Sequence, residues 1–172
     1  MADLGALERR VRELEARLRA AEDAQAIQWL KARYAELVDR RYHQGRAREG
    51  AELDAAARAI AELFTEDAVW DGGPALGRCQ GREAIYQRMR EPTLLFSWHF
   101  FLKPRIDVRD DEATARWDIL SPCTTRDGRP HWLVGTEDDT YRRVEGAWLH
   151  ARMQLTTVFL APHETGWTRV FV

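Results

Sequence analysis

Apolar residues at the start of the chain follow a heptad pattern, with alternating spacings of three and four residues. The series consists of Leu4, Leu7, Val11, Leu14, Leu18 and Ala21. Glutamate and arginine lie between them, so the stripe is narrow and typical of a helix that packs against another helix, in this domain or in a second subunit. A second series consists of Ile27, Leu30, Tyr34 and Leu37. The change of phase near Ala24 predicts a kinked helix that reaches about Tyr42.

Two shorter helices are predicted next, at residues 52–64 and 82–90, because apolar residues recur there at helical spacing. A short strand, EDAVWDGG, is predicted between them at residues 66–73. The later helix is expected to end before Pro92, since proline cannot continue a helix.

The residue composition changes after residue 95. From there on, β-branched and aromatic residues are frequent, and turn signals separate the segments. The four segments span residues 97–108, 113–123, 131–144 and 147–160. Strands at hairpin spacing after three helices predict an α+β domain, with helices packed on a curved antiparallel sheet. The expected organisation is an N-terminal helical extension at 1–23, the domain at 24–162 and a C-terminal arm at 163–172.

The composition of the chain excludes several classes of partner and cofactor. The 172 residues, of which 45% are hydrophobic, are enough for one core, and seven tryptophans suggest flat aromatic walls. The net charge is −2 and no basic stripe is present, so nucleic acid is not expected as a partner. Cys79 and Cys123 form neither a disulfide framework nor a metal motif, and no metal or cofactor is expected. No signal or membrane segment is recognised, so we expect a cytoplasmic protein without a membrane partner.

His99 lies in the stretch SWHFFLKP, among Trp98, Phe100 and Phe101. One interpretation is a partly buried histidine whose nitrogens bond to the backbone. The other is a base in a pocket, which needs a carboxylate partner that fixes the tautomer and stabilises the imidazolium.

Asp39 is the candidate partner on the first helix, five residues after Tyr34. Five helical steps correspond to an offset of about 140°, so both side chains could border one cavity. The alternative is a surface ion pair between Asp39 and its neighbouring arginines, which would have little energetic consequence.

Strand alternation does not decide whether other polar side chains face a cavity or water. Trp148, His150, Arg152, Gln154 and Thr156 share one predicted face of the last strand. That face could line a polar-tipped cavity, or Arg152 could simply lie in water. Asp118 either faces water or points into a site. The acidic run at residues 137–139 is expected at an edge or on an exposed face.

The ordered segments resemble a known family. They are AIQ…Y…D on the first helix, then LFTEDAVWDG, GREAI, SWHFFLKPRIDV, ATARWDIL and GTEDDTYRRVEGAWLHARM, over about residues 24–162. The set resembles the SnoaL-like branch of the NTF2-like superfamily, the group that contains bile-acid 7α-dehydratase, scytalone dehydratase and hexachlorocyclohexane dehydrochlorinase. The resemblance implies a cone-shaped α+β barrel, with three helices on a curved antiparallel sheet and an extra N-terminal helix.

The resemblance also implies a site. Asp39 and His99 stand where the family keeps its catalytic aspartate and histidine, and Tyr34 matches a tyrosine of the bile-acid dehydratase pattern. Asp118 and Arg152 match a second aspartate and a basic residue on the sheet. The expected substrate pocket consists of Trp98, Phe101, Trp70, Trp117 and His150.

The expected function is that of a cofactor-independent lyase, in which a His–Asp dyad removes a proton and water leaves from an apolar ring-bearing substrate. A steroid, a polyketide or a lignin-type aromatic would fit, in steroid or aromatic catabolism. Dehydrohalogenation, double-bond isomerisation or retro-aldol release of formaldehyde could use the same groups. An alternative of another class is a non-catalytic ligand-binding or oligomerisation module. A homo-oligomer is expected, and the resemblance favours a trimer over a dimer.

Overall fold

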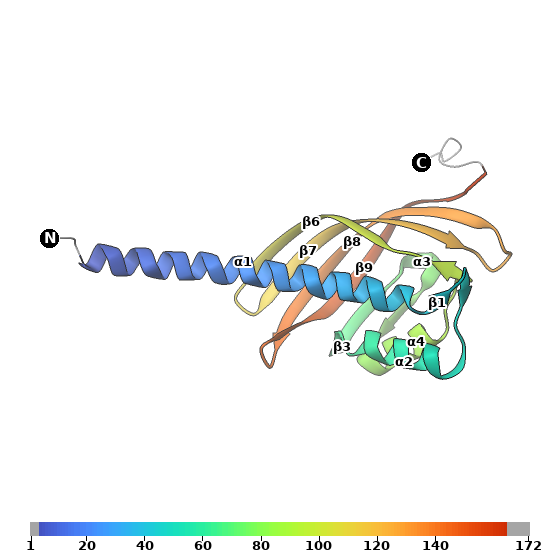
Figure 1. The fold of residues 1–172 in the computed structure, drawn as a ribbon, viewed down its shortest axis with the longest axis horizontal. Coiled ribbons are helices and arrows are strands. Elements are labelled where there is room, and N and C mark those ends of the chain that lie inside the picture. The colour runs from blue at the N-terminus through green and yellow to red at the C-terminus, as the bar shows by residue number, and fades with distance from the viewer. Residues whose placement is uncertain (1–3, 165–172) are drawn as a thin grey trace.

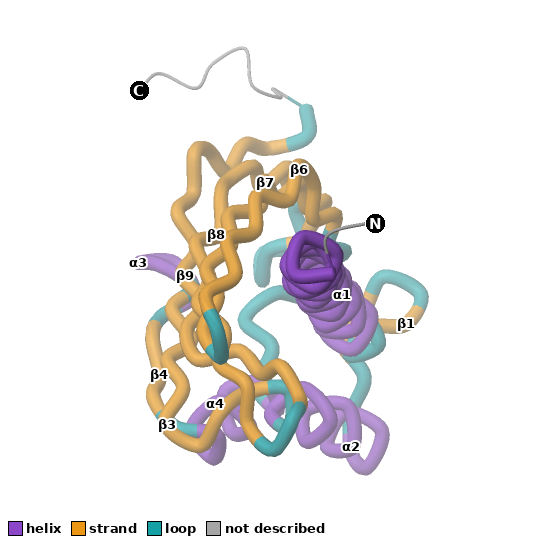
Figure 2. The backbone as a smooth tube through the Cα atoms, turned by 90° about the vertical axis from the view of Figure 1, so that its left-hand side faces the viewer, coloured by secondary structure: helices purple, strands orange, loops and turns teal. Residues whose placement is uncertain are grey.

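A long helix, α1 (Leu4–Asp39), runs into the concave side of a curved sheet in the computed structural model, which describes residues 4–164 (Figure 1). Figure 2 looks along α1 and shows the sheet curling past it, with α2 and α4 at one open side. The remaining helices are α2 (Gly50–Ala61), α3 (Gly73–Leu76) and α4 (Arg82–Arg90). No helix within this range is long and apolar enough to span a bilayer.

The strands form a seven-stranded sheet and a separate two-stranded ribbon. The sheet contains β3 (Phe64–Asp71), β4 (Arg78–Gln80), β5 (Phe96–Ser97), β6 (Phe100–Arg109), β7 (Glu112–Thr124), β8 (Pro130–Val144) and β9 (Ala147–Pro162), and the ribbon contains β1 (Tyr42–His43) and β2 (Arg46–Ala47). The order is β4-β3-β9-β8-β7-β5, and β6 also pairs with β7. The four long predicted strands are therefore present. The sheet is mixed rather than wholly antiparallel, because β3 runs parallel to β9.

The α+β barrel expected from the sequence is confirmed, but α1 differs in one respect. It is a single continuous helix that ends at Asp39, and Figure 1 shows it straight rather than kinked. The two apolar series occupy opposite faces: Leu18 and Ile27 are nine residues apart, which corresponds to about 180° around a helix. Ile27 is fully buried against the sheet, whereas Leu18 is 59% exposed. The change of phase therefore marks a change of face.

The proposed boundary at residue 23 falls inside α1, so the extension and the domain share one helix. Of the predicted C-terminal arm, only His163 and Glu164 lie within the described residues, where they form a turn. The backbone N–H of His163 donates to the carbonyl of Pro130 at 2.9 Å.

A β-bulge in β9 changes which side chains face the interior. Tyr141 of β8 pairs with His150, and the preceding Thr140 pairs with Arg152, so Ala151 is an extra residue on β9. An extra residue moves the following side chains to the other face. Trp148 and His150 before the bulge, and Met153 and Leu155 after it, are consequently buried. The single face predicted for Trp148 through Thr156 is thus corrected, and Arg152 is exposed.

Candidate active site

His99 and Asp39 are in direct contact. Nδ1 of His99 lies 2.7 Å from Oδ1 of Asp39, and the backbone N–H of His99 donates to both carboxylate oxygens at 3.2 and 3.3 Å. Asp39 is the last residue of α1, and His99 lies between β5 and β6. A carboxylate can only accept hydrogen bonds, so this contact fixes the proton on Nδ1 and leaves Nε2 as the unprotonated, basic nitrogen.

Backbone pairing places the histidine. Ser97 of β5 pairs with Cys123 of β7, and this holds the chain next to His99. Nε2 of His99 lies 3.3 Å from the Ser97 hydroxyl, which in turn lies 3.0 Å from the hydroxyl of Ser121. The imidazole is therefore held at both nitrogens, so its ring orientation is defined before any ligand binds.

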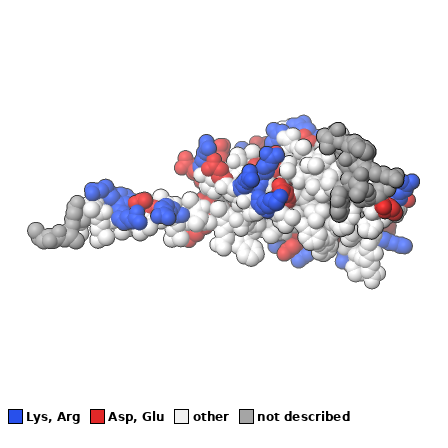
Figure 3. Space-filling model, turned by 90° about the horizontal axis from the view of Figure 1, so that it is seen from above, with Lys and Arg blue, Asp and Glu red and all other residues white. Residues whose placement is uncertain are grey.

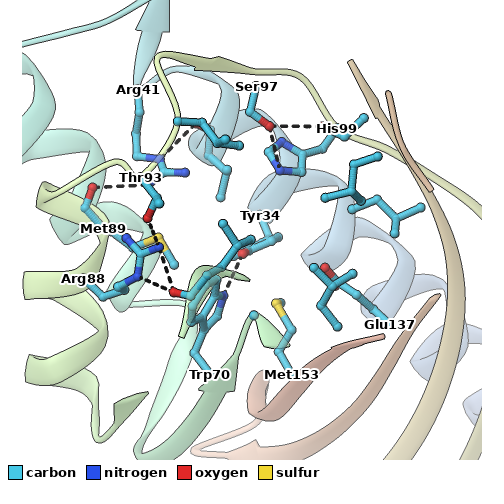
Figure 4. A pocket seen from close by; sticks show the side chains of 18 of the residues that line it. Tyr34, Arg41, Trp70, Arg88, Met89, Thr93, Ser97, His99, Glu137 and Met153 are labelled. Carbon is cyan, nitrogen blue, oxygen red and sulfur yellow. Dashed lines mark hydrogen bonds between the residues drawn. The ribbon is translucent and has the colours of Figure 1, made fainter. Parts of the chain in front are cut away.

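An inner cavity of about 60 Å³ lies beside His99 (Figure 4). Tyr34, Trp70, Glu137 and Met153 contribute to its lining. This volume holds only a few water molecules. A ring system needs more space, so a ring-bearing ligand would have to extend beyond the inner cavity.

An outer groove of about 990 Å³ adjoins the inner cavity. Leu76, Leu94, Leu133 and Leu155 line both spaces and form an apolar wall between them. Leu76 belongs to the one-turn helix α3, which begins at Gly73 and is followed by Gly77, both at positive φ. The groove and the inner cavity therefore share an apolar boundary.

Tyr34 reaches the inner cavity from α1. Its hydroxyl accepts a hydrogen bond from Nε1 of Trp70 at 3.1 Å, which leaves its own O–H free to donate. Burial raises the Tyr34 pKa, and the negative charge of Glu137 adds to this effect. Tyr34 therefore stays protonated and can act as a hydrogen-bond donor rather than a base.

The other predicted pocket residues lie around this site rather than in it, apart from Trp70. Phe101 stacks on His99, with ring centroids 6.1 Å apart. Trp98 is 46% exposed and borders a shallow outer surface next to Asp39. Trp117 and His150 belong to the interior: Nε1 of Trp117 donates to the Tyr141 hydroxyl at 3.2 Å, and His150 is fully buried.

Asp118 and Arg152 lie outside the cavity, which corrects the placement expected from the resemblance. Asp118 alternates with buried Trp117 and Ile119 on β7, so it faces outward and pairs with Lys103 at 2.5 Å. Arg152 follows the bulge at Ala151 and bonds to Gln154 at 2.6 Å on the exposed face. Neither side chain can reach a ligand beside His99.

A buried ionic cluster that the sequence analysis missed lies next to the cavity. The ammonium of Lys31 bonds to the carboxylates of Glu137 and Asp139, and these three residues are 1%, 5% and 2% exposed. The Tyr141 hydroxyl donates to Asp139 at 2.8 Å. The run at 137–139 is therefore not an exposed edge, because its first and last residues face the interior. The apolar face of α1 contained the missed signal: Lys31 is four residues after Ile27.

Burial and neighbouring charges shift the pKa values of the groups in and beside this cluster. Burial raises the pKa of Asp139 to about 6, although the charge of Lys31 opposes the effect. Burial alone would lower the Lys31 pKa, but Asp139 and Glu137 raise it above its ordinary value. Burial lowers the His150 pKa well below its ordinary value, with a further contribution from Lys31. Both ring nitrogens of His150 lack hydrogen-bond partners within residues 4–164, so this imidazole is a neutral interior group.

A metal centre is not formed by these residues. Within the described part of the chain, no group of three or more His, Cys, Asp or Glu side chains is arranged to hold an ion. Cys79 and Cys123 are free thiols. The polar groups at the inner cavity are a histidine with its carboxylate, two tyrosines, serine and threonine hydroxyls, Asp71, a glutamate held by lysine, and two arginines.

Comparison with known proteins identifies the family of the domain. A SnoaL-like domain model matches residues 19–154, which is more than half of the chain. The protein belongs to the SnoaL-like domain family. No curated protein matches its sequence.

Solved structures share the fold of this SnoaL-like domain. A putative scytalone dehydratase from Novosphingobium aromaticivorans is 22% identical, with a TM-score of 0.66 over 83% of this chain and 89% of that one. A hexachlorocyclohexane dehydrochlorinase from Novosphingobium barchaimii is 18% identical, with a TM-score of 0.68 over 88% and 95%. An NTF2-like protein with a cystatin-like fold, also from N. aromaticivorans, is 27% identical, with a TM-score of 0.67 over 92% of each chain.

Replacing Lys31 with methionine is expected to lower the free energy of unfolding by about 3–5 kcal/mol, because two carboxylates then stay buried without a counter-charge. Urea denaturation measures the change. The triple variant Lys31→Met/Glu137→Gln/Asp139→Asn should recover much of the loss, since it removes the charges together.

Lys103 provides the matched control for Lys31, because it is the only other lysine and also pairs with an aspartate, but is 75% exposed. Lys103→Met should cost at most about 1 kcal/mol. Equal effects of the two substitutions would contradict the importance assigned to the buried cluster.

The raised Asp139 pKa predicts a specific dependence of stability on pH. Between about pH 4 and pH 6, the folded state holds a proton on Asp139 that the unfolded chain has already released. The contribution of Asp139 to the free energy of unfolding should therefore fall as the pH rises through this window and then stay constant. The difference between wild type and Asp139→Asn in urea denaturation isolates it. Asp138→Asn, at the neighbouring exposed position, is the surface control. A flat difference for Asp139→Asn would contradict the assignment.

Proposed function

We propose that this SnoaL-like domain is a lyase in which His99 removes a proton from a carbon atom of an apolar ring-bearing substrate and water is eliminated. The contact between Nδ1 of His99 and the Asp39 carboxylate, at 2.7 Å, is the observation that carries the proposal. It supports a base at Nε2 beside the inner cavity, with a carboxylate that stabilises the imidazolium formed on proton transfer.

The elimination can be written with the groups at the cavity. Nε2 of His99 takes the proton, the electron pair of the C–H bond forms the double bond, and the C–O bond breaks. The departing oxygen accepts a hydrogen bond from Tyr34, which supports its developing negative charge. The proton on His99 then passes to that oxygen, and water leaves while the imidazole returns to its neutral form.

Two side chains were considered as the donor to the leaving group, and their positions support one of them. Tyr34 and Arg152 were the two candidates for assistance to the leaving group, and Arg152 lies on the exposed face of β9. Tyr34 lines the inner cavity with a free O–H, so we assign this role to Tyr34. The apolar groove supports a substrate with a ring system, such as a steroid, a polyketide or a lignin-type aromatic.

Related reactions share the same first step. Dehydrohalogenation, double-bond isomerisation and retro-aldol release of formaldehyde each need one base and differ in the group that departs. Two of the structural relatives are described as a putative dehydratase and a dehydrochlorinase. Elimination is therefore the reaction class that we favour. Product masses distinguish loss of water from loss of hydrogen chloride, loss of formaldehyde or no change.

Replacing His99 with glutamine is expected to lower kcat roughly 10²- to 10⁴-fold, the range of general base catalysis. The assay follows product mass on a panel of hydroxylated aromatic, steroid and polyketide compounds. Asp39→Asn should also lower kcat, because its amide cannot stabilise the imidazolium as a carboxylate does. His43→Gln, at an exposed position, should leave kcat unchanged. Turnover by His99→Gln at the rate of the wild type would exclude His99 as the base.

A further inference from the structure

Two arginines line the inner cavity without an acidic partner. Figure 4 shows Arg41 and Arg88 on one side of the cavity and His99 on the other. Arg41 is only 7% exposed; its Nε donates to the carbonyl of Val38 at 3.1 Å and one Nη to the carbonyl of Met89 at 3.3 Å. These acceptors are neutral, so the charge of Arg41 is not compensated by them.

Arg88 is also bound only by neutral groups. It donates to the carbonyls of Leu76 and Glu91 and to the Thr93 hydroxyl. Among residues 4–164, no carboxylate forms a salt bridge with either arginine. Burial lowers the Arg88 pKa, and the nearby positive charge of Arg41 lowers it further.

Arg41 retains donor capacity for a ligand. A guanidinium has five N–H groups, and the described residues accept hydrogen bonds from Nε and one Nη of Arg41. The acids near the cavity are already engaged: Asp39 bonds to His99, Glu137 bonds to Lys31, and Asp71 accepts from the backbone N–H of Gly73. A buried cation without a counter-charge is costly, so an anion in the cavity would bind favourably.

We propose that Arg41 and Arg88 form a subsite for a carboxylate group of the substrate, across the cavity from His99. The planar fork of a guanidinium matches the two oxygens of a carboxylate, which supports a carboxylate over a spherical anion. The substrate class is then a ring-bearing carboxylic acid whose reacting carbon lies toward Nε2. This deepens the proposed function and rests on it for the reaction, but binding can be measured without turnover.

Calorimetric titration with benzoate and with its neutral analogue benzamide tests the subsite at constant ionic strength. Wild-type protein should bind benzoate more tightly than benzamide. Arg41→Gln should weaken benzoate binding roughly 10- to 100-fold, as expected for loss of a charge-assisted hydrogen bond, and leave benzamide binding unchanged. Arg88→Gln should act in the same direction. Arg40→Gln is the matched control, since Arg40 is adjacent but exposed, and it should bind benzoate like the wild type.

The experiments distinguish a failure of the carboxylate subsite from a failure of the proposed reaction. His99→Gln should lose turnover and keep the preference for benzoate over benzamide. If benzoate shows no preference, or Arg41→Gln keeps it with an unchanged melting profile, the carboxylate subsite is wrong, whether or not His99 is the base. Displacement of benzoate by an equal concentration of chloride would identify a simple halide site and also overturn the proposal.

A second, independent inference concerns the first half of α1, which projects beyond the sheet in Figure 1. Its heptad residues Leu4, Leu7, Val11, Leu14 and Leu18 are between 43% and 70% exposed. Figure 3 shows charged and uncharged side chains side by side along this projecting segment. The matched SnoaL-like region begins only at residue 19, so most of this seam precedes it.

The charged residues beside the seam favour a parallel pairing with an identical helix. Glu8, Glu15 and Glu22 each follow a seam residue on one side, and Arg10 and Arg17 each precede one on the other. In a parallel pair of identical helices, each arginine lies opposite the glutamate five residues later in the other helix. Arg10 would then face Glu15 of the partner subunit, and Arg17 would face Glu22 of the partner subunit. An antiparallel pair would place arginine against arginine.

We infer that residues 4–21 form a parallel coiled coil with a second copy of this chain. The seam lies about 180° from the face of α1 that packs on the sheet, so a second helix can approach from outside. Light scattering should show association of the wild type that is lost in Val11→Glu/Leu14→Glu. A monomeric wild type at micromolar concentration, or unchanged association of the variant, would contradict the inference.

Cross-linking tests the orientation. A Leu7→Cys variant should form an intermolecular disulfide under mild oxidation, because equivalent seam positions meet only in a parallel pair. Wild-type protein, which retains Cys79 and Cys123, is the background control. Association without the Leu7→Cys cross-link would rule out the parallel arrangement.

Discussion

The ion cluster of Lys31, Glu137 and Asp139 fixes how α1 sits inside the curved sheet. A buried ammonium between two buried carboxylates allows one rotation and one axial position of the helix, because any shift would leave a charge unpaired. Tyr34 follows Lys31 by about one turn, and Asp39 ends the same helix. The positions of the tyrosine hydroxyl and of the carboxylate that meets His99 thus depend on a contact that lies deeper in the molecule.

The acids and bases of the candidate site differ in whether they have a partner of opposite charge. Asp39 is bound to His99 and Glu137 to Lys31, so each acid at this end of the barrel already has a basic partner. Arg41 and Arg88 are the exception, since they are held by carbonyl and hydroxyl oxygens. A neutral interior made mostly of aromatic and aliphatic side chains strengthens these differences, because electrostatic interactions are less screened there than in water.

Much of the fold could be predicted from the sequence, because the features concerned are periodic. The long strands at 97–160 alternate clearly, and α1 shows two helical apolar series. The meeting of His99 with Asp39 was expected from the family resemblance, and their 2.7 Å contact is present. Periodicity could not reveal the bulge at Ala151, since one extra residue changes the face of everything after it without changing the composition. It therefore misplaced Arg152. The cluster of Lys31 with Glu137 was missed for another reason: charged residues are rarely buried, and their partners here are more than one hundred positions apart.

Because α1 has two opposite faces, its first turns offer a point of attachment away from the cavity. Its inward face carries Tyr34 and Asp39 at the cavity, whereas the outward face of its first turns projects beyond the sheet. Surface immobilisation or fusion to another protein through these first turns would thus leave the reacting groups undisturbed. The same separation means that substitutions on the outward face can be made without changing the residues that pack on the sheet.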